Sequence, residues 1–489
     1  MDAQTAPLTA LQPLTHRESR RIVFGVLLPT FLGSLDNTVL ASALPTIGRD
    51  FGDVASLPWL ITAYLIAATA VIPLYGKIAD IRGRAFALRL ALVLYISAAL
   101  ICALAPNMLT LIFGRVIYGF GGGGLTSLGM IVLGDIAAPK ERGRYYAYFS
   151  VVYTSAGAMG PALGGFLSDY VHWSAIFWLN LPLGLIALAM TATLLRRLPR
   201  YERPHRLDVA GAILIVIASV AFMLALNQGG LRYAWTSPPI VTLLAAAIIF
   251  GGAFVWRLST AIEPLIPLAI LATPEARIGI AANAFGWGAI IGLNIFLPMY
   301  LQSAVGMTAT HSGVSLMVLM VALNVSAGIS GQLLGRVKRY KLVPMLGLGV
   351  AVVAIFTLAW RADRVTPLEF EIMVALFGLG FGPLPPLCTT VVQNSVAVHH
   401  LGAAIGTMNF LRNLFTTMLV AVFGAIVMSG GSALVPAADP SSSAVAAGQA
   451  AAAFSRVFFA ATASLVVAFI GLLLLKEKPL QTNLPPPRR

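Results

Sequence analysis

Fourteen apolar runs divide the chain, and each is long enough to cross a lipid bilayer as an α-helix. A membrane-spanning helix needs about 20 largely apolar residues. The runs cover residues 22–48, 57–79, 86–105, 108–135, 145–168, 175–195, 209–228, 239–256, 278–303, 312–335, 342–360, 370–392, 401–428 and 456–475. The sequence therefore predicts an all-α integral membrane protein with 14 transmembrane helices. The sixth and eighth runs are the weakest, because they are short or flanked by proline.

The composition excludes a water-soluble protein. Of the 489 residues, 58% are hydrophobic and only 10% are charged, whereas soluble domains carry about 25% charged residues. Cys102 and Cys388 lie inside apolar runs, so no disulfide framework is indicated. Residues 1–20 are polar and lack the short apolar core of a cleavable signal peptide, so we expect the first span to act as the insertion signal.

The basic residues divide unequally between the two sides of the predicted bundle. The net charge of +14 is also seen in nucleic-acid-binding proteins. With the N-terminus placed inside, however, 25 of the 32 Lys and Arg fall on that side and five on the other. The remaining two, Arg115 and Arg412, lie inside spans. This bias follows the positive-inside rule, so we expect cytoplasmic N- and C-termini, contact with the lipid bilayer and no nucleic-acid partner.

A basic segment recurs at matching places in the two halves of the chain. Gly76–Arg84 follows the second span and Gly331–Arg339 follows the tenth. Two packed halves around a central site are typical of secondary transporters, although any bundle with an inside N-terminus places basic loops at such intervals. We predict an N-terminal tail (1–20), a six-helix bundle (21–196), a linker with two additional helices (197–276), a second six-helix bundle (277–476) and a C-terminal tail (477–489).

Asp36 is the acidic residue nearest the middle of a predicted span. A carboxylate in the bilayer is costly and is a functional candidate by default. Arg115 is its expected partner. The two residues lie about 18 Å and about 10 Å below the outer ends of their helices, and the long arginine side chain can bridge most of that difference. Burial favours a protonated carboxyl and a nearby arginine favours a carboxylate, so such a group suits proton coupling. A static ion pair, or an Arg115 that extends to the interface, is the alternative.

The fifth span carries a face of small residues. Ala156, Gly160 and Gly164 recur at intervals of four, which favours close helix contact, and Pro161 permits a bend. This pattern suits a pivot or seal between two conformations, and simple packing explains it equally well.

The loop after the second span suggests a conformational latch. Asp80 is flanked by Lys77, Arg82 and Arg84, and we expect it to pair with them or with the N-terminus of a neighbouring helix. A contact formed in one conformation only would act as a latch. Topology-setting charge is the alternative.

Together these segments resemble the major facilitator superfamily, and within it the fourteen-span drug:proton antiporter branch (the EmrB/QacA-like transporters). The resemblance extends from about Ile22 to Leu475. It rests on Leu35–Val39 with Ala43–Pro45, Gly76–Arg84, Arg115 with Gly119, Gly160-Pro161 with Gly164-Gly165, the set Trp173, Phe177, Asn180, Pro182 and Gly184, and the set Gln393, Asn394, Gly402, Gly406 and Arg412. It departs at Ile81 and Ala85, where basic residues are usual, and at Ala156, where glycine is usual.

The resemblance implies a major facilitator fold of six, two and six helices, and proton-driven export of hydrophobic or amphipathic small molecules (multidrug efflux) by alternating access. It implies no enzyme activity and no cofactor, with the proton gradient as the driving force. It gives proton coupling to Asp36 and Arg115, and the latch to Gly76, Asp80, Arg82, Gly83 and Arg84. The antiporter helix is assigned to Gly160, Pro161, Gly164 and Gly165.

The substrate is less constrained than the driving force. We expect polar and aromatic residues within spans to line a central cavity, although the same residue types form interfacial belts. The expected set is Asn37, Tyr118, Tyr153, Asn283, Trp287, Asn294, Asn409 and Arg412. With one carboxylate opposite two arginines, the charge of the substrate stays open.

Three alternatives compete with multidrug export. The first is export of one endogenous metabolite or lipid, and the second is a transporter-like sensor that moves nothing. An intramembrane enzyme would need clustered His, Cys or acidic residues, and the adjacent His399 and His400 lack such neighbours; no metal site is expected. We predict a monomer in the cytoplasmic membrane of a bacterium, with an envelope adaptor as a further option at the loop 429–454.

Overall fold

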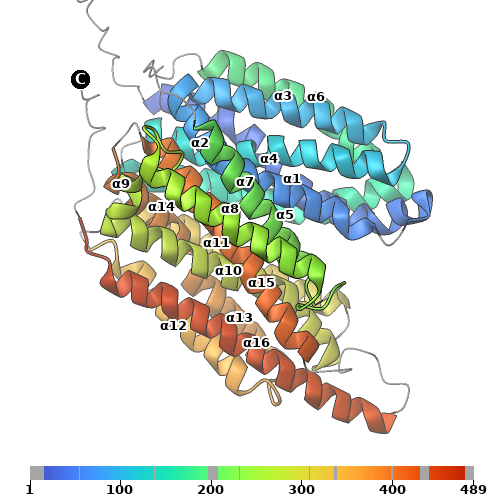
Figure 1. Ribbon diagram of the computed structural model, residues 1–489. Coiled ribbons are helices and arrows are strands. Elements are labelled where there is room, and N and C mark those ends of the chain that lie inside the picture. The colour runs from blue at the N-terminus through green and yellow to red at the C-terminus, as the bar shows by residue number, and fades with distance from the viewer. Residues whose placement is uncertain are drawn as a thin grey trace, which may run out of the picture.

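The computed structural model describes residues 16–53, 56–136, 139–195, 208–230, 232–307, 309–334, 337, 339–397, 400–429 and 440–478. Within them the regular structure is helical (Figure 1). The helices are α1 (His16–Phe51), α2 (Leu57–Arg82), α3 (Arg84–Ala103), α4 (Met108–Ile136), α5 (Pro139–Tyr170), α6 (Ala175–Leu194), α7 (Val209–Gln228), α8 (Pro238–Thr260), α9 (Leu268–Ala272), α10 (Pro274–Ser303), α11 (Ala309–Leu334), α12 (Leu342–Trp360), α13 (Pro367–Phe381), α14 (Leu384–Ser395), α15 (Leu401–Ser429) and α16 (Pro440–Leu474). Most of the two predicted tails (1–15 and 479–489) and much of the loop 429–454 lie outside the described residues.

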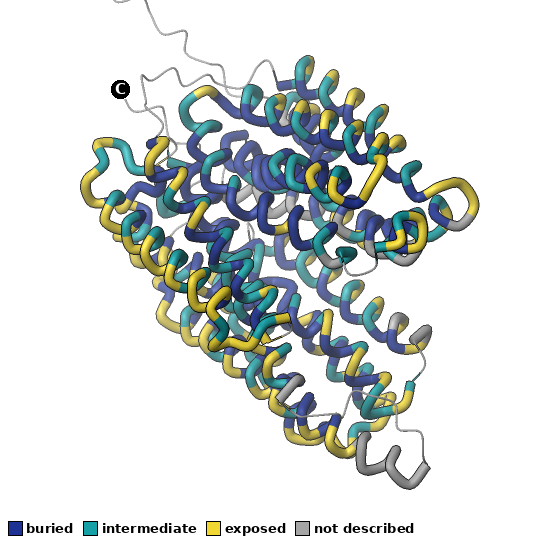
Figure 2. Tube along the Cα trace, turned by 45° about the vertical axis from the view of Figure 1, so that its right-hand side comes forward, coloured by how far each residue is buried: buried dark blue, intermediate teal, exposed yellow. Residues whose placement is uncertain are grey.

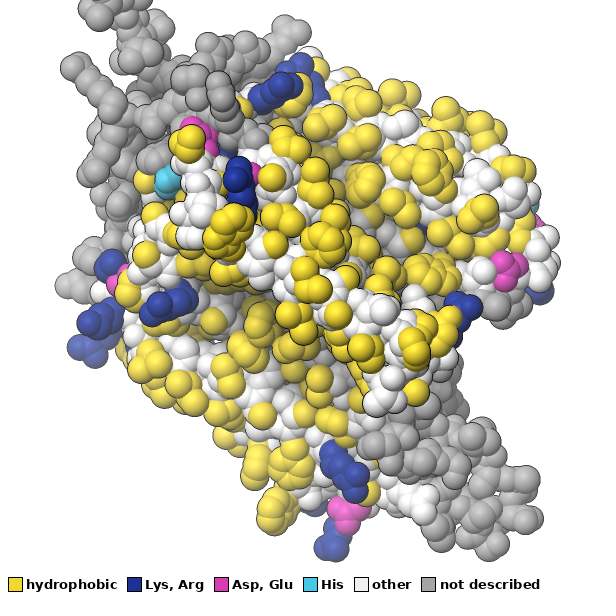
Figure 3. All heavy atoms as spheres, in the orientation of Figure 1, with side chains coloured by type: hydrophobic (Ala, Val, Ile, Leu, Met, Phe, Trp, Pro, Cys, Tyr) yellow, Lys and Arg dark blue, Asp and Glu magenta, His cyan; other side chains and the backbone are white. Residues whose placement is uncertain are grey.

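The predicted spans correspond to these helices. Thirteen described stretches are long and apolar enough to cross a membrane. They include α6 and α8, the two spans predicted least strongly, and one stretch that joins α13 and α14 across Gly382 and Pro383. The predicted span not among them is α5, which is 32 residues long but rich in Gly, Ser and Tyr. The all-α membrane architecture is thus confirmed. Figure 3 shows why lipid suits this molecule, because the visible face is mostly hydrophobic and charged side chains gather toward its edges.

The helices form two bundles, each with its own core. Helices α1–α6 lie together in the upper part of Figure 1 and α10–α16 in the lower part. Buried apolar side chains of α1–α6 form most of one core, which also takes in residues of α9, α10, α14 and α15, and side chains of α10–α16 form a second core. We call these the first and second halves. Lipid tails are as apolar as leucine, so helices in a membrane are held together by close packing through small residues. Gly119 and Gly121 of α4 show this packing, because backbone atoms of α2 and α3 occupy the space that their side chains would need.

Helices α7 and α8 lie over the junction of the two halves (Figure 1). A small apolar cluster joins α7 and α8 to Ile72 of α2 and Phe410 of α15. A hydrogen bond from Thr62 of α2 to the side-chain oxygen of Asn227 (3.3 Å) ties α7 to the first half. The two additional helices therefore cover the seam between α2 and α15 and leave the facing surfaces of the halves to each other.

The two halves approach each other most closely at one end of the molecule. In Figure 2 they lie together near the end where α1 begins and diverge toward the other end. The first ten residues of α15, Leu401–Phe410, are all buried at the close end. That end carries the Gly76–Arg84 segment, so we call it the basic-loop end.

Candidate functional site

The Asp36–Arg115 pair lies inside the first half, between α1 and α4. The Nη1 of Arg115 donates to Oδ2 of Asp36 at 2.7 Å. The two side chains are 1% and 0% exposed, so the ion pair is withdrawn from both water and lipid. The structure thus brings together the two residues that the sequence places within reach of an arginine side chain. Removing one partner of such a buried pair is costly.

Arg115 is held by groups besides Asp36. Its Nε donates to the carbonyl oxygen of Leu60 at 2.9 Å. Its guanidinium carbon lies 4.5 Å from the ring centre of Tyr64 and 5.2 Å from that of Tyr118, within the range of cation–π attraction. The guanidinium is therefore held by three groups whose contacts do not depend on the charge of Asp36.

Asp36 uses only one of its two oxygens. Its Oδ1 is buried and has no hydrogen-bond partner among the described residues. A buried polar atom of this kind calls for an explanation, and a carboxylate oxygen is a proton acceptor. Tyrosine hydroxyls fix the backbone of α1 one turn earlier, because Tyr95 donates to Leu32 O (3.0 Å) and Tyr64 to Gly33 O (3.4 Å). Oδ1 of Asp36 can therefore bind and release a proton, while hydrogen bonds from Tyr95 and Tyr64 hold the backbone one turn earlier.

Helix α5 lies directly against the segment of α1 that carries Asp36. Thr38 donates to the carbonyl oxygen of Ala156 at 3.1 Å. A Cβ at Gly160 would collide with Thr38, and one at Gly164 would collide with the carbonyl of Val39. These two glycines are therefore required for contact between the helices. Gly165 meets no such neighbour, and the side chains of Asn37 and Pro161 lie outside the described part of the chain.

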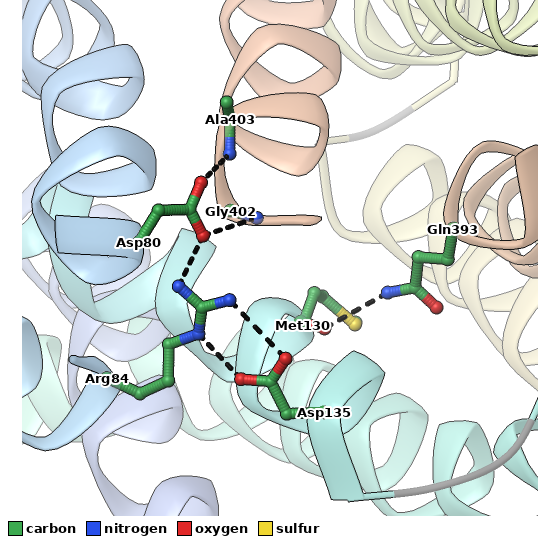
Figure 4. Close-up of polar contacts among 7 residues, drawn as sticks. All are labelled: Asp80, Arg84, Met130, Asp135, Gln393, Gly402 and Ala403. Carbon is green, nitrogen blue, oxygen red and sulfur yellow. Dashed lines mark hydrogen bonds and ion pairs between the residues drawn. The ribbon is translucent and has the colours of Figure 1, made fainter. Parts of the chain in front are cut away.

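At the basic-loop end, Asp80 joins the two halves. Its two carboxylate oxygens accept from the backbone N–H groups of Gly402 (3.1 Å) and Ala403 (2.8 Å), at the start of α15 (Figure 4). A helix N-terminus favours such a negative charge. Arg84 donates to Asp80 and also, through Nε, to Oδ2 of Asp135 on α4 at 2.6 Å. The three charged side chains form one buried network at the junction of α2, α3, α4 and α15.

The other latch residues have different parts in this junction. A Cβ at Gly76 would fall on the backbone carbonyl of Gly402, so glycine allows α2 and α15 to touch. Gly83 has φ +89° between α2 and α3, a conformation that side chains other than glycine rarely adopt. Arg82 is exposed and lies over the ring of Phe86, 5.3 Å from its centre. Arg84, and not Arg82, is therefore the arginine that meets Asp80.

Three further polar contacts join the halves, and the sequence did not reveal them. Gln393 on α14 donates to the carbonyl oxygen of Met130 on α4 at 3.1 Å (Figure 4). Ser150 on α5 donates to the side-chain oxygen of Asn324 on α11 at 3.0 Å. Asn413 on α15 donates to Thr69 on α2 at 3.3 Å. A polar residue inside a span was the available signal, and its partner on a distant helix was not predictable from spacing.

The residues expected around a cavity fall into two groups. Tyr118 is fully buried and accepts from Asn180 at 2.8 Å, and Asn283 and Asn409 are also buried. Tyr153 is 37% exposed, and Asn294, Trp287 and Arg412 are partly exposed. The Arg412 guanidinium lies over Trp287, 5.3 Å from its ring centre. The second group therefore contains the accessible side chains. No group of three or more His, Cys, Asp or Glu suited to a metal ion occurs within the described residues.

Comparisons with known proteins agree with this geometry. Residues 26–420 match the family described as the Major Facilitator Superfamily. The chain is 31% identical over 418 residues to the multidrug transporter protein MdtP of Bacillus subtilis, covering 84% of this chain and 76% of that protein. It is 29% identical over 416 residues to multidrug resistance protein 3 of the same organism, covering 83% and 79%.

Solved structures show the same fold at low sequence identity. The proton:xylose symporter XylE superposes with a TM-score of 0.64 at 13% identity, covering 95% of this chain and 97% of that one. The human organic anion transporter MFSD10 superposes with a TM-score of 0.60 at 15% identity, covering 91% and 99%. At such identities the likeness concerns the fold alone.

Proposed function

Because this chain belongs to the major facilitator superfamily, a family of transporters and not of enzymes, we propose that it exports hydrophobic or amphipathic small molecules in exchange for protons. The multidrug names of its relatives MdtP and multidrug resistance protein 3 support this substrate range. Both relatives are bacterial, which together with the basic-loop bias supports a bacterial cytoplasmic membrane with both termini inside.

The proposal rests on the buried carboxyl group of Asp36, one oxygen of which has no hydrogen-bond partner among the described residues. Asp36 is 1% exposed, its Oδ2 is paired with Arg115, and its Oδ1 has no partner among the described residues. A proton on the carboxyl removes the charge that attracts Arg115, while Leu60 and two tyrosine rings keep the guanidinium in place. Protonation therefore loosens α1 from α4 without displacing Arg115.

The packing of α1 gives this event a route to the interface between the halves. Thr38 ties α1 to α5, and Ser150 of α5 contacts Asn324 of the second half. Two conformations that differ in the angle between the halves would differ in these contacts and in the Asp80 contact to α15. In our proposal, proton binding at Asp36 and opening at the basic-loop end belong to different steps of one transport cycle.

Proton movement in inside-out membrane vesicles tests the proposal. Vesicles from a bacterial host that lacks its own drug exporters are given a pH gradient by respiration, and a chemically broad panel of hydrophobic compounds is added. We expect at least one compound to collapse the gradient with the wild-type protein and not with Asp36→Asn. Asn keeps the shape of the side chain and an oxygen for Arg115, but it does not titrate.

Asp363→Asn is the matched control, because Asp363 lies in an exposed ion pair with Arg364 whose side chains are 59% and 82% accessible. The control variant is expected to respond like the wild type. A response by Asp36→Asn equal to the wild type would exclude Asp36 as the proton site. Silence of the wild type across the whole panel would contradict multidrug export and favour a single endogenous substrate or a sensor.

A further inference from the structure

We propose that Arg412, Trp287 and Tyr153 form a binding site for an amphipathic aromatic anion, with the guanidinium holding the carboxylate or sulfonate of the substrate. The inference rests on the proposed export function and narrows its substrate class. It starts from a difference between two arginines inside spans, the buried Arg115 and the partly exposed Arg412: only the first has a carboxylate partner among the described residues.

The three side chains lie at a common depth. Arg412, Trp287 and Tyr153 lie 11, 13 and 14 residues after the first residues of α15, α10 and α5. All three helices start from the basic-loop side, and at 1.5 Å per residue these positions are about 16–21 Å along their helices. Tyr153 belongs to the first half and the other two to the second half. The group therefore lies between the halves and near the middle of the bilayer, where transporters of this architecture bind substrates.

The contacts of Arg412 leave its charge uncompensated. Its Nε reaches the side-chain oxygen of Asn413 at 3.4 Å, and its guanidinium carbon lies 5.3 Å from the ring centre of Trp287. The side chain of Tyr153 lies within electrostatic range of it. These are neutral partners. A charged side chain at this depth is costly and marks a substrate or ion pathway, and the remaining N–H groups of the guanidinium form a fork that matches a carboxylate.

The acidic residues of the spans do not offset this charge. Asp36 is paired with Arg115, and Asp80 and Asp135 share Arg84. Glu371 accepts a hydrogen bond from Ser315 at 2.6 Å, only four residues after the start of α13. A lipophilic cation between the halves would therefore meet a positive charge with no nearby free carboxylate among the described residues, whereas an anion would neutralise that charge.

Helix α15 changes from buried to partly exposed just before Arg412. Residues Leu401–Phe410 are all buried, but every residue from Leu411 to Met418 is partly exposed. Eight consecutive residues cover all sides of a helix, so the side of α15 that faces the first half is also accessible. Tyr153 is 37% exposed on the opposite helix. Trp287 and Tyr153 offer the flat surfaces that an aromatic substrate needs.

A matched pair of dyes tests the charge preference. Anilinonaphthalene sulfonate is an anion, and phenylnaphthylamine has the same ring system without the sulfonate. Equilibrium binding is measured to the purified full-length protein in lipid nanodiscs, with empty nanodiscs subtracted, and ethidium serves as the cation. We expect the wild type to bind the anion more tightly than either other dye. Arg412→Gln should weaken binding of the anion by about tenfold or more and change that of the neutral dye much less.

Two variants keep the test informative. Arg412→Lys retains the charge without the fork and is expected to give intermediate affinity for the anion. Arg456→Gln removes one positive charge from an exposed position on α16 and should leave the dye order unchanged. A monodisperse profile in size-exclusion chromatography is required of each variant, and the neutral dye reports an intact aromatic surface within the same sample.

The outcomes separate this inference from the proposed function. Equal losses of the anionic and neutral dyes in Arg412→Gln, or a wild type that prefers ethidium, would overturn the anion site. Binding needs no gradient, so an Arg412-dependent preference in a protein that moves no protons would uphold the site and reject proton-coupled export.

For export of one anion against one proton, two positive charges move inward per cycle. Uptake of the anionic dye by energised inside-out vesicles should therefore fall when valinomycin and K⁺ remove the membrane potential.

Discussion

Arg115 and Arg412 both lie well inside their spans, and they differ in what surrounds their charge. Arg115 lies inside the first half, 1% exposed, with Asp36 at 2.7 Å and a backbone carbonyl at 2.9 Å. Arg412 lies between the halves, partly exposed, over the indole of Trp287. The first is neutralised within its own half, and the second has no carboxylate partner among the described residues. In our proposal, the fold thus separates a site for the proton from a site for the substrate.

The largest expected effect comes from removing one member of the neutralised pair. Asp36→Ala leaves Arg115 buried without its counter-charge, which costs about 3–5 kcal/mol, and a lower thermal unfolding midpoint in detergent would show it. Arg412→Ala removes a charge that has no carboxylate partner among the described residues, so its midpoint should change little. Equal destabilisation by the two substitutions would contradict the comparison.

A double substitution sharpens the same point. Asp36→Leu combined with Arg115→Met removes both charges and keeps side chains of similar length. We expect most of the lost stability to return, because replacing a buried ion pair by apolar residues is often neutral or stabilising. Proton-driven export should stay absent in the vesicle assay. Recovered export would show that coupling does not depend on this pair.

Arg84 extends the comparison to a third arginine, which shares two carboxylates. Asp80→Ala removes the acceptor for the N–H groups of Gly402 and Ala403. Charge-assisted hydrogen bonds contribute about 1.5–3 kcal/mol each, so the basic-loop end should open more often. Gln393→Cys, with Cys102 and Cys388 replaced, should then react at least about tenfold faster with a water-soluble maleimide, since 1.4 kcal/mol is a factor of ten. Asp363→Ala is the control, and an unchanged rate in Asp80→Ala would exclude the latch.

Asn413→Asp, with a smaller expected effect, should give Arg412 a carboxylate partner like the one that Arg115 has. Asn413→Asp places a carboxylate where the amide oxygen now lies 3.4 Å from the Nε of Arg412. We expect binding of the anionic dye to fall by about tenfold and that of ethidium to rise, because the site becomes neutral before the ligand arrives. Asn413→Ser, which also loses the amide donor to Thr69, separates the charge from the lost hydrogen bond. Equal effects of Asp and Ser would remove charge as the explanation.

The smallest expected effect concerns the aromatic surface under Arg412. Trp287→Phe keeps a ring but weakens the cation–π contact, which contributes about 0.5–1 kcal/mol at accessible sites. Binding of the anionic and neutral dyes should therefore fall two- to fivefold. Trp256→Phe, at an exposed position of α8 (69% exposed), is the matched control. An unchanged affinity in Trp287→Phe would place the dye elsewhere.

The sequence alone predicts the spans and the depth of each charged residue, and the sidedness of the spans stays a prediction. Length and apolarity decide whether a helix can cross a bilayer, and a fixed rise per residue converts chain position into depth. That is why chain position is enough to pair Asp36 with Arg115. The same reasoning assigned the glycines of α5 to close helix contact, and Gly160 and Gly164 lie against Thr38 and Val39.

Tertiary structure alone decided which residues meet at a given depth. Spacing places a residue along its helix, but the direction of its side chain toward a particular neighbour depends on how all the helices pack. Asp135 as the second partner of Arg84, the start of α15 as the partner of Asp80, and Met130 as the acceptor for Gln393 follow from that packing. Packing also separated Tyr118, buried against Asn180, from Tyr153, which is 37% exposed. The depth of a residue depends on its own helix, whereas a site needs side chains from several helices and so depends on how those helices pack.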